Sequence, residues 1–336
     1  MKSTLTILSL SLLLISCTDS RTVKSGSASN LTRSGISGLT KVSEVRFNEK
    51  DFDAFQINSN GNNLYLSGTQ IAFSKWEIRA DAELPRIVFA AHDNIGTTDF
   101  TTFGAWTPAN LASGALSVIG SWAYLSGAAG LSVVDMGDTS RPVERARYPQ
   151  STGTDINRDP NFVYKALVAH PTLPVLYGFR EQDYVYTLNA NGQNVSIAKQ
   201  SPYTAAGQNT CCVMGAAVFQ NKLYVAFTQS LWIYSFGANG ELTGLVVNDQ
   251  IKPVGISATT DTLYIYHQPA KSSSISKSIG PAGIYAFDAG QNLIGFVGGV
   301  QPYSFAVSQD NSHLYANIDQ RAVTIYQINW NSIVNP

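Results

Sequence analysis

Charged side chains and sulfur-containing residues are scarce in this chain of 336 residues. Charged residues make up 13% of the sequence, about half of the share that is usual in soluble domains. Lysine and arginine do not form a long run, and the formal net charge is −1. Nothing therefore indicates a nucleic-acid partner or a polybasic membrane patch. Only three cysteines are present, at positions 17, 211 and 212.

Short apolar strands separated by polar turns recur along most of the chain. The unit is clearest at 303–328, where three such strands are divided by turns rich in Asn, Asp, Ser and Gln. A Leu-Tyr or Ala-Tyr pair marks the second strand of each unit. These marks fall at Tyr65, Tyr124, Tyr177, Tyr224, Tyr264 and Tyr315. Their spacing is at or above that of four-stranded blades, so six marks predict an all-β, six-bladed β-propeller.

The two ends of the repeat region are each incomplete. The last unit has no fourth strand, whereas the alternating segment Leu39–Phe47 has no partner in the first unit. We expect this N-terminal segment to supply the outer strand of the last blade, which would close the ring and protect an open edge. The alternative of seven blades requires a blade within 80–113, where only 86–90 has the pattern of a strand.

The first residues indicate export. Lys2 precedes the apolar run Leu5–Ile15, which is too short for a transmembrane helix but suits a signal peptide. The sequence Leu-Ile-Ser-Cys that ends at Cys17 resembles the lipobox of bacterial lipoproteins. That resemblance implies cleavage before Cys17 and lipidation of this residue, and Thr18 after it implies the outer membrane. The alternative is an ordinary signal peptide followed by an unrelated cysteine.

These features predict three segments. Residues 1–16 would be the lipoprotein signal peptide, and 17–38 would be the lipidated cysteine with a flexible tether rich in Ser, Gly and Thr. Residues 39–336 would form the propeller domain. More than one acyl chain on Cys17 would anchor the protein stably to the membrane.

Two kinds of repeat carry a family resemblance. Gly130–Asp135, followed by Asp138–Val143, is similar to the LVIVD repeat of bacterial surface propellers. The two C-terminal repeats are similar to the related YVTN type. Families with these repeats include adhesins, scaffolds and enzymes, so the resemblance implies the fold and not one activity. Unequal repeat lengths separate this chain from the YVTN consensus.

Four long insertions predict where the functional surface lies. They are 91–113, 149–164, 200–213 and 267–283, and all join strands at the same face of the propeller. Loops on a rigid scaffold often carry function, so we place the functional surface there. Insertions that drifted without a role are the alternative.

The pair Cys211-Cys212 is the sharpest feature of that surface. Disulfides persist in the bacterial envelope, and once Cys17 is lipidated the two cysteines can pair internally only with each other. The resulting vicinal disulfide would be a rigid staple, a platform for a ligand or a redox element. Some propeller quinoprotein dehydrogenases use such a disulfide, but their tryptophan-rich repeats are missing here.

Other loop residues are weaker candidates. Asp155 and Asp159 belong to an alternating run that is similar to the start of a calcium loop, although Pro160 stands where glycine is expected. His92 and His267 each begin a long loop and have no zinc-motif spacing. Trp106 could anchor a partner or cover the central channel. We expect no cofactor or metal, with calcium as the alternative.

No general catalytic signature occurs in the sequence, which contains neither G-x-S-x-G nor H-E-x-x-H nor a phosphate-binding glycine loop. We therefore expect a monomeric, lipid-anchored binding or scaffold module of the bacterial envelope that recognises a protein or glycan. The alternative is an envelope enzyme, either a lactonase-like hydrolase or a quinone-dependent oxidoreductase, with its site at the mouth of the central channel. A third possibility is a structural envelope protein.

Overall fold

The computed structural model of the protein describes most of the repeat region. The described residues are 38–46, 56–68, 72–78, 86–90, 115–127, 130–138, 142–148, 164–180, 184–202, 212–269, 279–318 and 322–329. The chain divides into two compact units, Met1–Ser34 and Gly35–Pro336, and every described residue belongs to the second. Among these residues no helix is long and apolar enough to cross a membrane.

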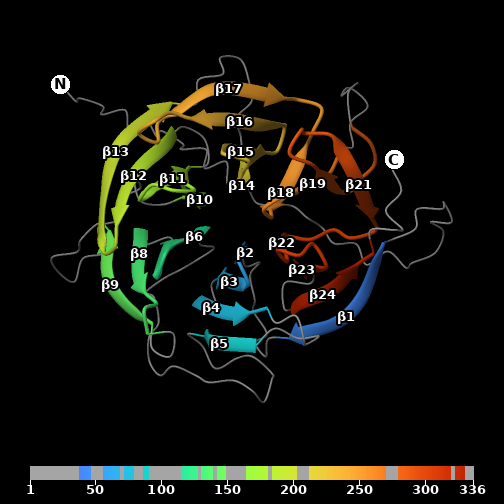
Figure 1. The fold of residues 1–336 in the computed structure, drawn as a ribbon, viewed down its shortest axis with the longest axis horizontal. Coiled ribbons are helices and arrows are strands. Elements are labelled where there is room, and N and C mark those ends of the chain that lie inside the picture. The colour runs from blue at the N-terminus through green and yellow to red at the C-terminus, as the bar shows by residue number, and fades with distance from the viewer. Residues whose placement is uncertain are drawn as a thin grey trace, which may run out of the picture. The chain divides into compact units, whose positions relative to one another are not determined.

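The described strands form six antiparallel sheets of four strands arranged as a ring, which is a six-bladed β-propeller (Figure 1). Blade 1 has β2 (Gln56–Asn60), β3 (Asn63–Gly68), β4 (Ala72–Glu77) and β5 (Arg86–Ala90). Blade 2 has β6 (Ala115–Ile119), β7 (Trp122–Gly127), β8 (Gly130–Asp135) and β9 (Val143–Tyr148). Blade 3 has β10 (Ala166–Ala169), β11 (Val175–Phe179), β12 (Tyr184–Asn191) and β13 (Asn194–Pro202).

The second half of the ring has the same order. Blade 4 has β14 (Val213–Phe219), β15 (Lys222–Phe227), β16 (Ser230–Phe236) and β17 (Leu242–Asn248). Blade 5 has β18 (Pro253–Ala258), β19 (Leu263–His267), β20 (Gly283–Phe287) and β21 (Leu293–Gly298). Blade 6 has β22 (Ser304–Val307), β23 (His313–Asn317), β24 (Ala322–Ile328) and, as its outer strand, β1 (Leu39–Arg46).

The innermost strands are crowded around the central axis. Each of them, β2, β6, β10, β14, β18 and β22, contacts the innermost strand of the next blade. A Cβ atom added to Gly215 would lie 3.2 Å from Ile256, and one added to Gly255 would lie 3.1 Å from Phe305. Each of these two glycines therefore makes room for a large side chain of the next blade.

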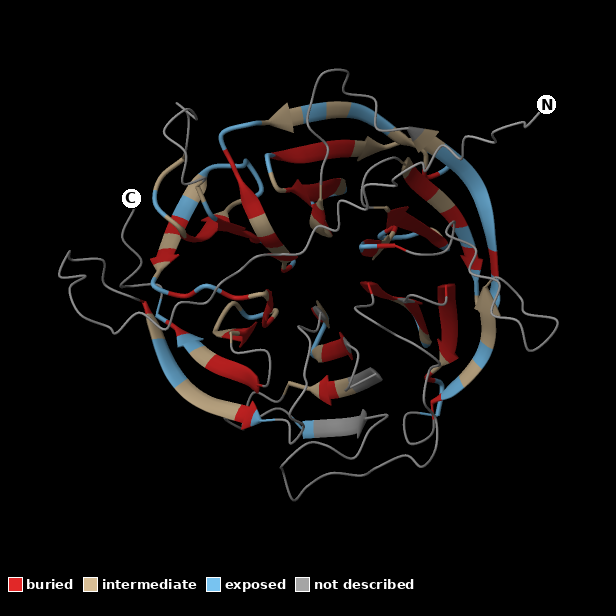
Figure 2. Ribbon diagram, turned by 180° about the vertical axis from the view of Figure 1, so that it is seen from behind, coloured by how far each residue is buried: buried red, intermediate tan, exposed pale blue. Residues whose placement is uncertain are grey.

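The hydrophobic core lies between neighbouring blades. Second and third strands are buried on both faces, whereas the outer strands consist mainly of intermediate and exposed residues (Figure 2). One cluster joins Tyr124 and Leu131 of blade 2 to Leu176 and Tyr186 of blade 3. Because each sheet is covered by two others, its middle strands are apolar on both sides, as a parallel-sheet strand would be.

The tyrosines that mark the repeats hold adjacent blades together. The hydroxyl of Tyr124 donates to the carbonyl of Gly192 at 2.9 Å, and that of Tyr177 donates to the carbonyl of Gly240 at 2.5 Å. Both glycines lie in the last turn of the next blade and have φ values of 60° and 80°. Residues other than glycine rarely adopt this left-handed conformation. The glycine in each turn therefore places its carbonyl where the tyrosine hydroxyl of the preceding blade can donate to it.

The N-terminal strand closes the ring, as the sequence predicts. β1 pairs antiparallel with β24 from Leu39 opposite Ile328 to Arg46 opposite Ala322 (Figure 1, blue beside dark red). Val45 is 4% exposed and packs in the cluster that contains Trp76 of blade 1. The closing strand therefore contacts blade 6, to which it belongs, and blade 1. We call this junction between blades 6 and 1 the seam.

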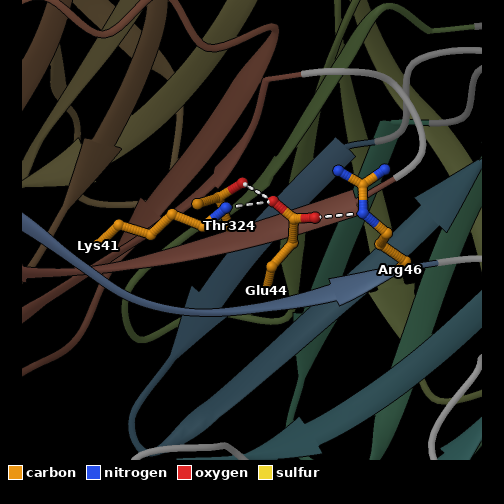
Figure 3. Close-up of polar contacts among 4 residues, drawn as sticks. All are labelled: Lys41, Glu44, Arg46 and Thr324. Carbon is orange, nitrogen blue, oxygen red and sulfur yellow. Dashed lines mark hydrogen bonds and ion pairs between the residues drawn. The ribbon is translucent and has the colours of Figure 1, made fainter.

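Glu44 is the centre of a polar group at this seam (Figure 3). Its carboxylate accepts a hydrogen bond from the Lys41 ammonium at 2.6 Å and from the Thr324 hydroxyl at 3.5 Å, and it forms an ion pair with Arg46. Desolvation raises the pKa of Glu44, but the hydrogen bond from Lys41 and the charge of Arg46 outweigh it and lower the pKa. The carboxylate stays ionised near neutral pH.

The connections between strands differ in length at the two faces of the ring. Strands are antiparallel, so links from first to second and from third to fourth strands share one face, which we call the short-turn face. The remaining links define the loop-rich face, which carries the longest connections, at 91–114, 149–165, 203–212 and 268–282.

Some predicted loop boundaries are wrong by a few residues. Gln200 belongs to β13, and Val213 and Gly283 begin β14 and β20, because each pairs with a neighbouring strand. The short-turn face also carries two longer links, at 78–85 and 136–142. The described residues give six sheets, so the seven-bladed alternative receives no support from them.

Candidate functional site: the loop-rich face and the central channel

Cys212 lies at the edge of the loop-rich face, immediately before β14. It has a φ of 66°, and its carbonyl accepts a hydrogen bond from the N–H of Thr228 at 3.2 Å. Cys212 is disulfide-bonded, and Cys211 lies outside the described residues. A left-handed backbone at a residue other than glycine is uncommon, so this turn is held in a constrained conformation.

His267 is the last residue of β19 and is completely buried. The prediction that it begins an exposed loop is therefore wrong, because His267 pairs with Pro253 and Gly283 within the sheet. Its Nδ1 accepts the N–H of Lys252 at 2.8 Å, and its ring meets that of Tyr285 edge-on at 5.6 Å. Burial lowers the pKa of His267 to about 4. The imidazole is neutral at pH 7 and has a structural role.

Lys252 forms hydrogen bonds that link three connections of the loop-rich face. These are the connection between β17 and β18, to which it belongs, the one between β15 and β16, and the one that follows β19. It is 7% exposed, and its ammonium donates to the carbonyls of Gln229 at 2.6 Å and Asp249 at 2.5 Å. Its own carbonyl accepts the N–H of Gln268 at 2.9 Å. A buried ammonium is stabilised only where such acceptors replace water. Lys252 and His267 therefore fix the points from which the loop 268–282 leaves and returns.

The other residues proposed from the sequence are not placed by the structure. Cys17, His92, Trp106, Asp155, Asp159 and Cys211 lie outside the described residues. Of the predicted site, the structure thus places Cys212 and His267, on adjacent blades 4 and 5. Within the described residues no group of three or more His, Cys, Asp or Glu side chains is arranged to hold a metal ion.

A central channel runs between the innermost strands and has two parts of different width. The narrow part, with a volume of about 30 Å³, lies toward the loop-rich face and is lined by Lys165, Met214 and Tyr303. The wide part, of about 290 Å³, reaches the short-turn face, where His170 and Asn60 line it. Residues common to both parts form the constriction between them. These are Ile57, Asn58, Leu116, Leu167, Ala216 and Ile256.

The wide part of the channel is polar but carries no formal charge. Asn58, Ser117, His170 and Ser257 line it together with aliphatic side chains, and no described Asp, Glu, Lys or Arg does. The sequence analysis did not find these residues, because the lining is divided among five blades, each of which contributes only three to five residues. The only available signal was their position in the strand before each tyrosine mark.

The architecture defines the class of the protein as a six-bladed β-propeller with a closed seam and a central channel, a fold that suits a binding or scaffold module. Comparison with models of protein families and with curated proteins found no match to this chain. The function is therefore argued from the site alone.

Proposed function

We propose that this protein is a lipid-anchored binding or scaffold module of the bacterial envelope, which recognises a protein or glycan through its loop-rich face. The observation that carries the proposal is the difference between the two faces. The longest connections, 91–114, 149–165, 203–212 and 268–282, all leave the sheets at the loop-rich face. Variable loops that project from a rigid scaffold are a common way to build a recognition surface.

The base of this face supports the same proposal. Lys252 and His267 anchor the ends of the loop 268–282, and Cys212 constrains the end of the connection 203–212. A fixed base reduces the entropy that a loop loses when it binds a partner. We propose that Cys212 pairs with Cys211 and that this disulfide stiffens the recognition surface.

The envelope location rests on the sequence. The apolar run Leu5–Ile15 and the lipobox-like sequence that ends at Cys17 support export, cleavage and lipidation. The resemblance of 130–143 to LVIVD repeats supports a surface propeller. Radiolabelled palmitate should be incorporated into the wild-type protein and not into a Cys17→Ser variant. Equal labelling of both proteins would refute lipidation at this residue.

Photo-crosslinking in living cells tests the recognition surface. A photoreactive phenylalanine would replace single residues of the loops 91–114 and 149–165 in the full-length protein, with matched control positions in 78–85 on the short-turn face. We expect crosslinked partners or glycans from the loop positions and none from the controls. Crosslinks that come only from 78–85, or from no position at all, would contradict the proposal.

Mass spectrometry tests the cysteine pair and the enzyme alternative together. The denatured protein should be lighter by two hydrogens than the reduced protein, and proteolysis should place the bond between Cys211 and Cys212. Two free thiols would refute the disulfide. A metal or organic cofactor that stays bound only in the native state would favour an envelope enzyme over a binding module.

A further inference from the structure

We propose that the wide part of the central channel binds a neutral, hydroxyl-rich small molecule of about the size of one sugar ring. This site opens on the short-turn face, opposite the surface assigned above, and the proposal does not depend on that assignment. It rests on the volume of the cavity, on its polar groups and on the lack of charge in its described lining.

The volume suits a single-ring ligand. The cavity of about 290 Å³ is comparable to the smallest sites that bind small molecules. An engineered cavity of about 150 Å³ is large enough for benzene, so this one can hold a ring that carries several hydroxyl groups. The constriction at Ile57, Leu116 and Ile256 separates it from the narrow part of the channel.

Two buried serines supply unused hydrogen-bonding groups. Ser117 of blade 2 and Ser257 of blade 5 line the cavity, and each is only 7% exposed. Neither hydroxyl makes a hydrogen bond to any part of the chain that the structure describes. Both hydroxyls remain accessible from the channel, so water or a ligand can satisfy them, and a serine can both donate and accept.

Asn58 adds a group of defined polarity. The ring of His170 packs against that of Phe236 with 4.6 Å between centroids, and its Nδ1 accepts the N–H groups of Thr172 at 3.1 Å and Leu173 at 3.0 Å, so we do not count the imidazole among the groups offered to the ligand. Burial lowers the pKa of His170, so the ring is neutral at pH 7. Asn58 donates through Nδ2 to the carbonyl of Leu116 at 2.9 Å, and its Oδ1 remains an acceptor.

The backbone of the innermost strands adds further partners. Each of these strands is the last in its sheet, so the backbone groups on its inner edge have no ladder partner among the described strands. Together with the serines, they offer donors and acceptors from the five blades that line the cavity. Such an arrangement suits a ligand with hydroxyl groups on several sides of its ring.

The lack of charge selects against ionic ligands. No Asp, Glu, Lys or Arg lines the cavity in the described part of the chain, and burial of an unpaired charge is very unfavourable. Aliphatic side chains such as Leu167 and Val218 would contact the C–H faces of the ring. The chemistry is therefore that of a neutral sugar or cyclitol.

Ligand-observed saturation-transfer NMR on the full-length protein tests the site. The neutral probes are methyl glucoside, N-acetylglucosamine and myo-inositol, and the charged probes of similar size are glucuronate and glucosamine. The test variant is Ser117→Ala combined with Ser257→Ala. The control is Ser132→Ala in β8, because Ser132 is equally buried, at 4% exposed, and does not line the cavity.

We expect at least one neutral probe to bind at millimolar concentrations and the charged probes to bind far more weakly. The double variant should bind at least about tenfold more weakly, since two hydrogen bonds are lost, and the control should bind like the wild type. Thermal melts establish that each variant is folded. Three results would overturn the proposal: no signal from any neutral probe, equal binding of charged probes, or binding that the double variant retains.

Discussion

The closing strand β1 allows a quantitative prediction about the stability of the ring. Val45 is 4% exposed and lies in a core cluster with Leu64 and Trp76 of blade 1 and Val323 of blade 6. Substitution Val45→Ala removes two buried methyl groups, which costs about 1.6 kcal/mol of transfer free energy. The cavity that remains adds up to about 1 kcal/mol, so the free energy of unfolding should fall by about 2 kcal/mol.

Val143 provides a matched control for this substitution. It lies on β9, another outer strand, but its side chain is 41% exposed. Val143→Ala should therefore change the free energy of unfolding by less than about 0.5 kcal/mol. Urea denaturation followed by tryptophan fluorescence measures both values.

Hydrogen exchange then shows where Val45→Ala acts. The amides of 39–46 and 322–328 should lose protection first, because these segments pair only with each other and with β23. If Val45→Ala has no larger effect than Val143→Ala, or if all blades lose protection equally, β1 does not stabilise the ring in the way described.

Three further predictions concern single side chains. Tyr177→Phe removes the hydroxyl that donates to the carbonyl of Gly240, and it should lower the free energy of unfolding by about 1–2 kcal/mol in urea melts, whereas the partly exposed Tyr184→Phe should be nearly neutral. Burial lowers the pKa of His267 to about 4, so the unfolded chain binds the proton first and stability is lost as pH falls from about 6.5 to 4. This loss, about 3 kcal/mol, should be missing in His267→Gln, and equal pH profiles would refute it. The lowered pKa of Glu44 acts at lower pH. Its contribution, about 0.5–1 kcal/mol at this partly exposed site, is present above the ordinary pKa of 4.5 and is lost as pH falls through the folded-state value, so wild type and Glu44→Gln should converge in acid.

Much of the fold could be predicted because each strand carries its own local signal. Alternating or apolar segments bounded by Asn, Asp and Gly set the strands, and the tyrosine marks count the blades. The seam was also predictable, because the last blade lacked one strand and Leu39–Phe47 had no other partner. Loop boundaries were predicted less well: the predicted loops 200–213 and 267–283 are shorter in the structure, since Gln200, Val213 and Gly283 still pair with neighbouring strands.

The candidate sites were less accessible to sequence reasoning, for two physical reasons. His267 looks like a loop residue because a long insertion follows it, but sheet pairing extends one residue further and buries its ring. The cavity consists of small groups of residues from five blades, and Ser117 and Ser257 are 140 residues apart in the chain. Only the closed ring brings these hydroxyl groups together, so no local pattern indicates them.

The seam between β1 and β24 also has a consequence during synthesis. Glu44 and Thr324, which meet at the seam, are 280 residues apart, so the ribosome makes β1 first and β24 almost last. At usual translation speeds, β1 waits roughly 15 to 60 seconds for its partner. Lys41, Glu44 and Arg46 give this waiting strand alternating charges, which are known to oppose edge-to-edge aggregation. The charged cluster at the seam would thus protect the nascent chain before it helps to close the finished ring.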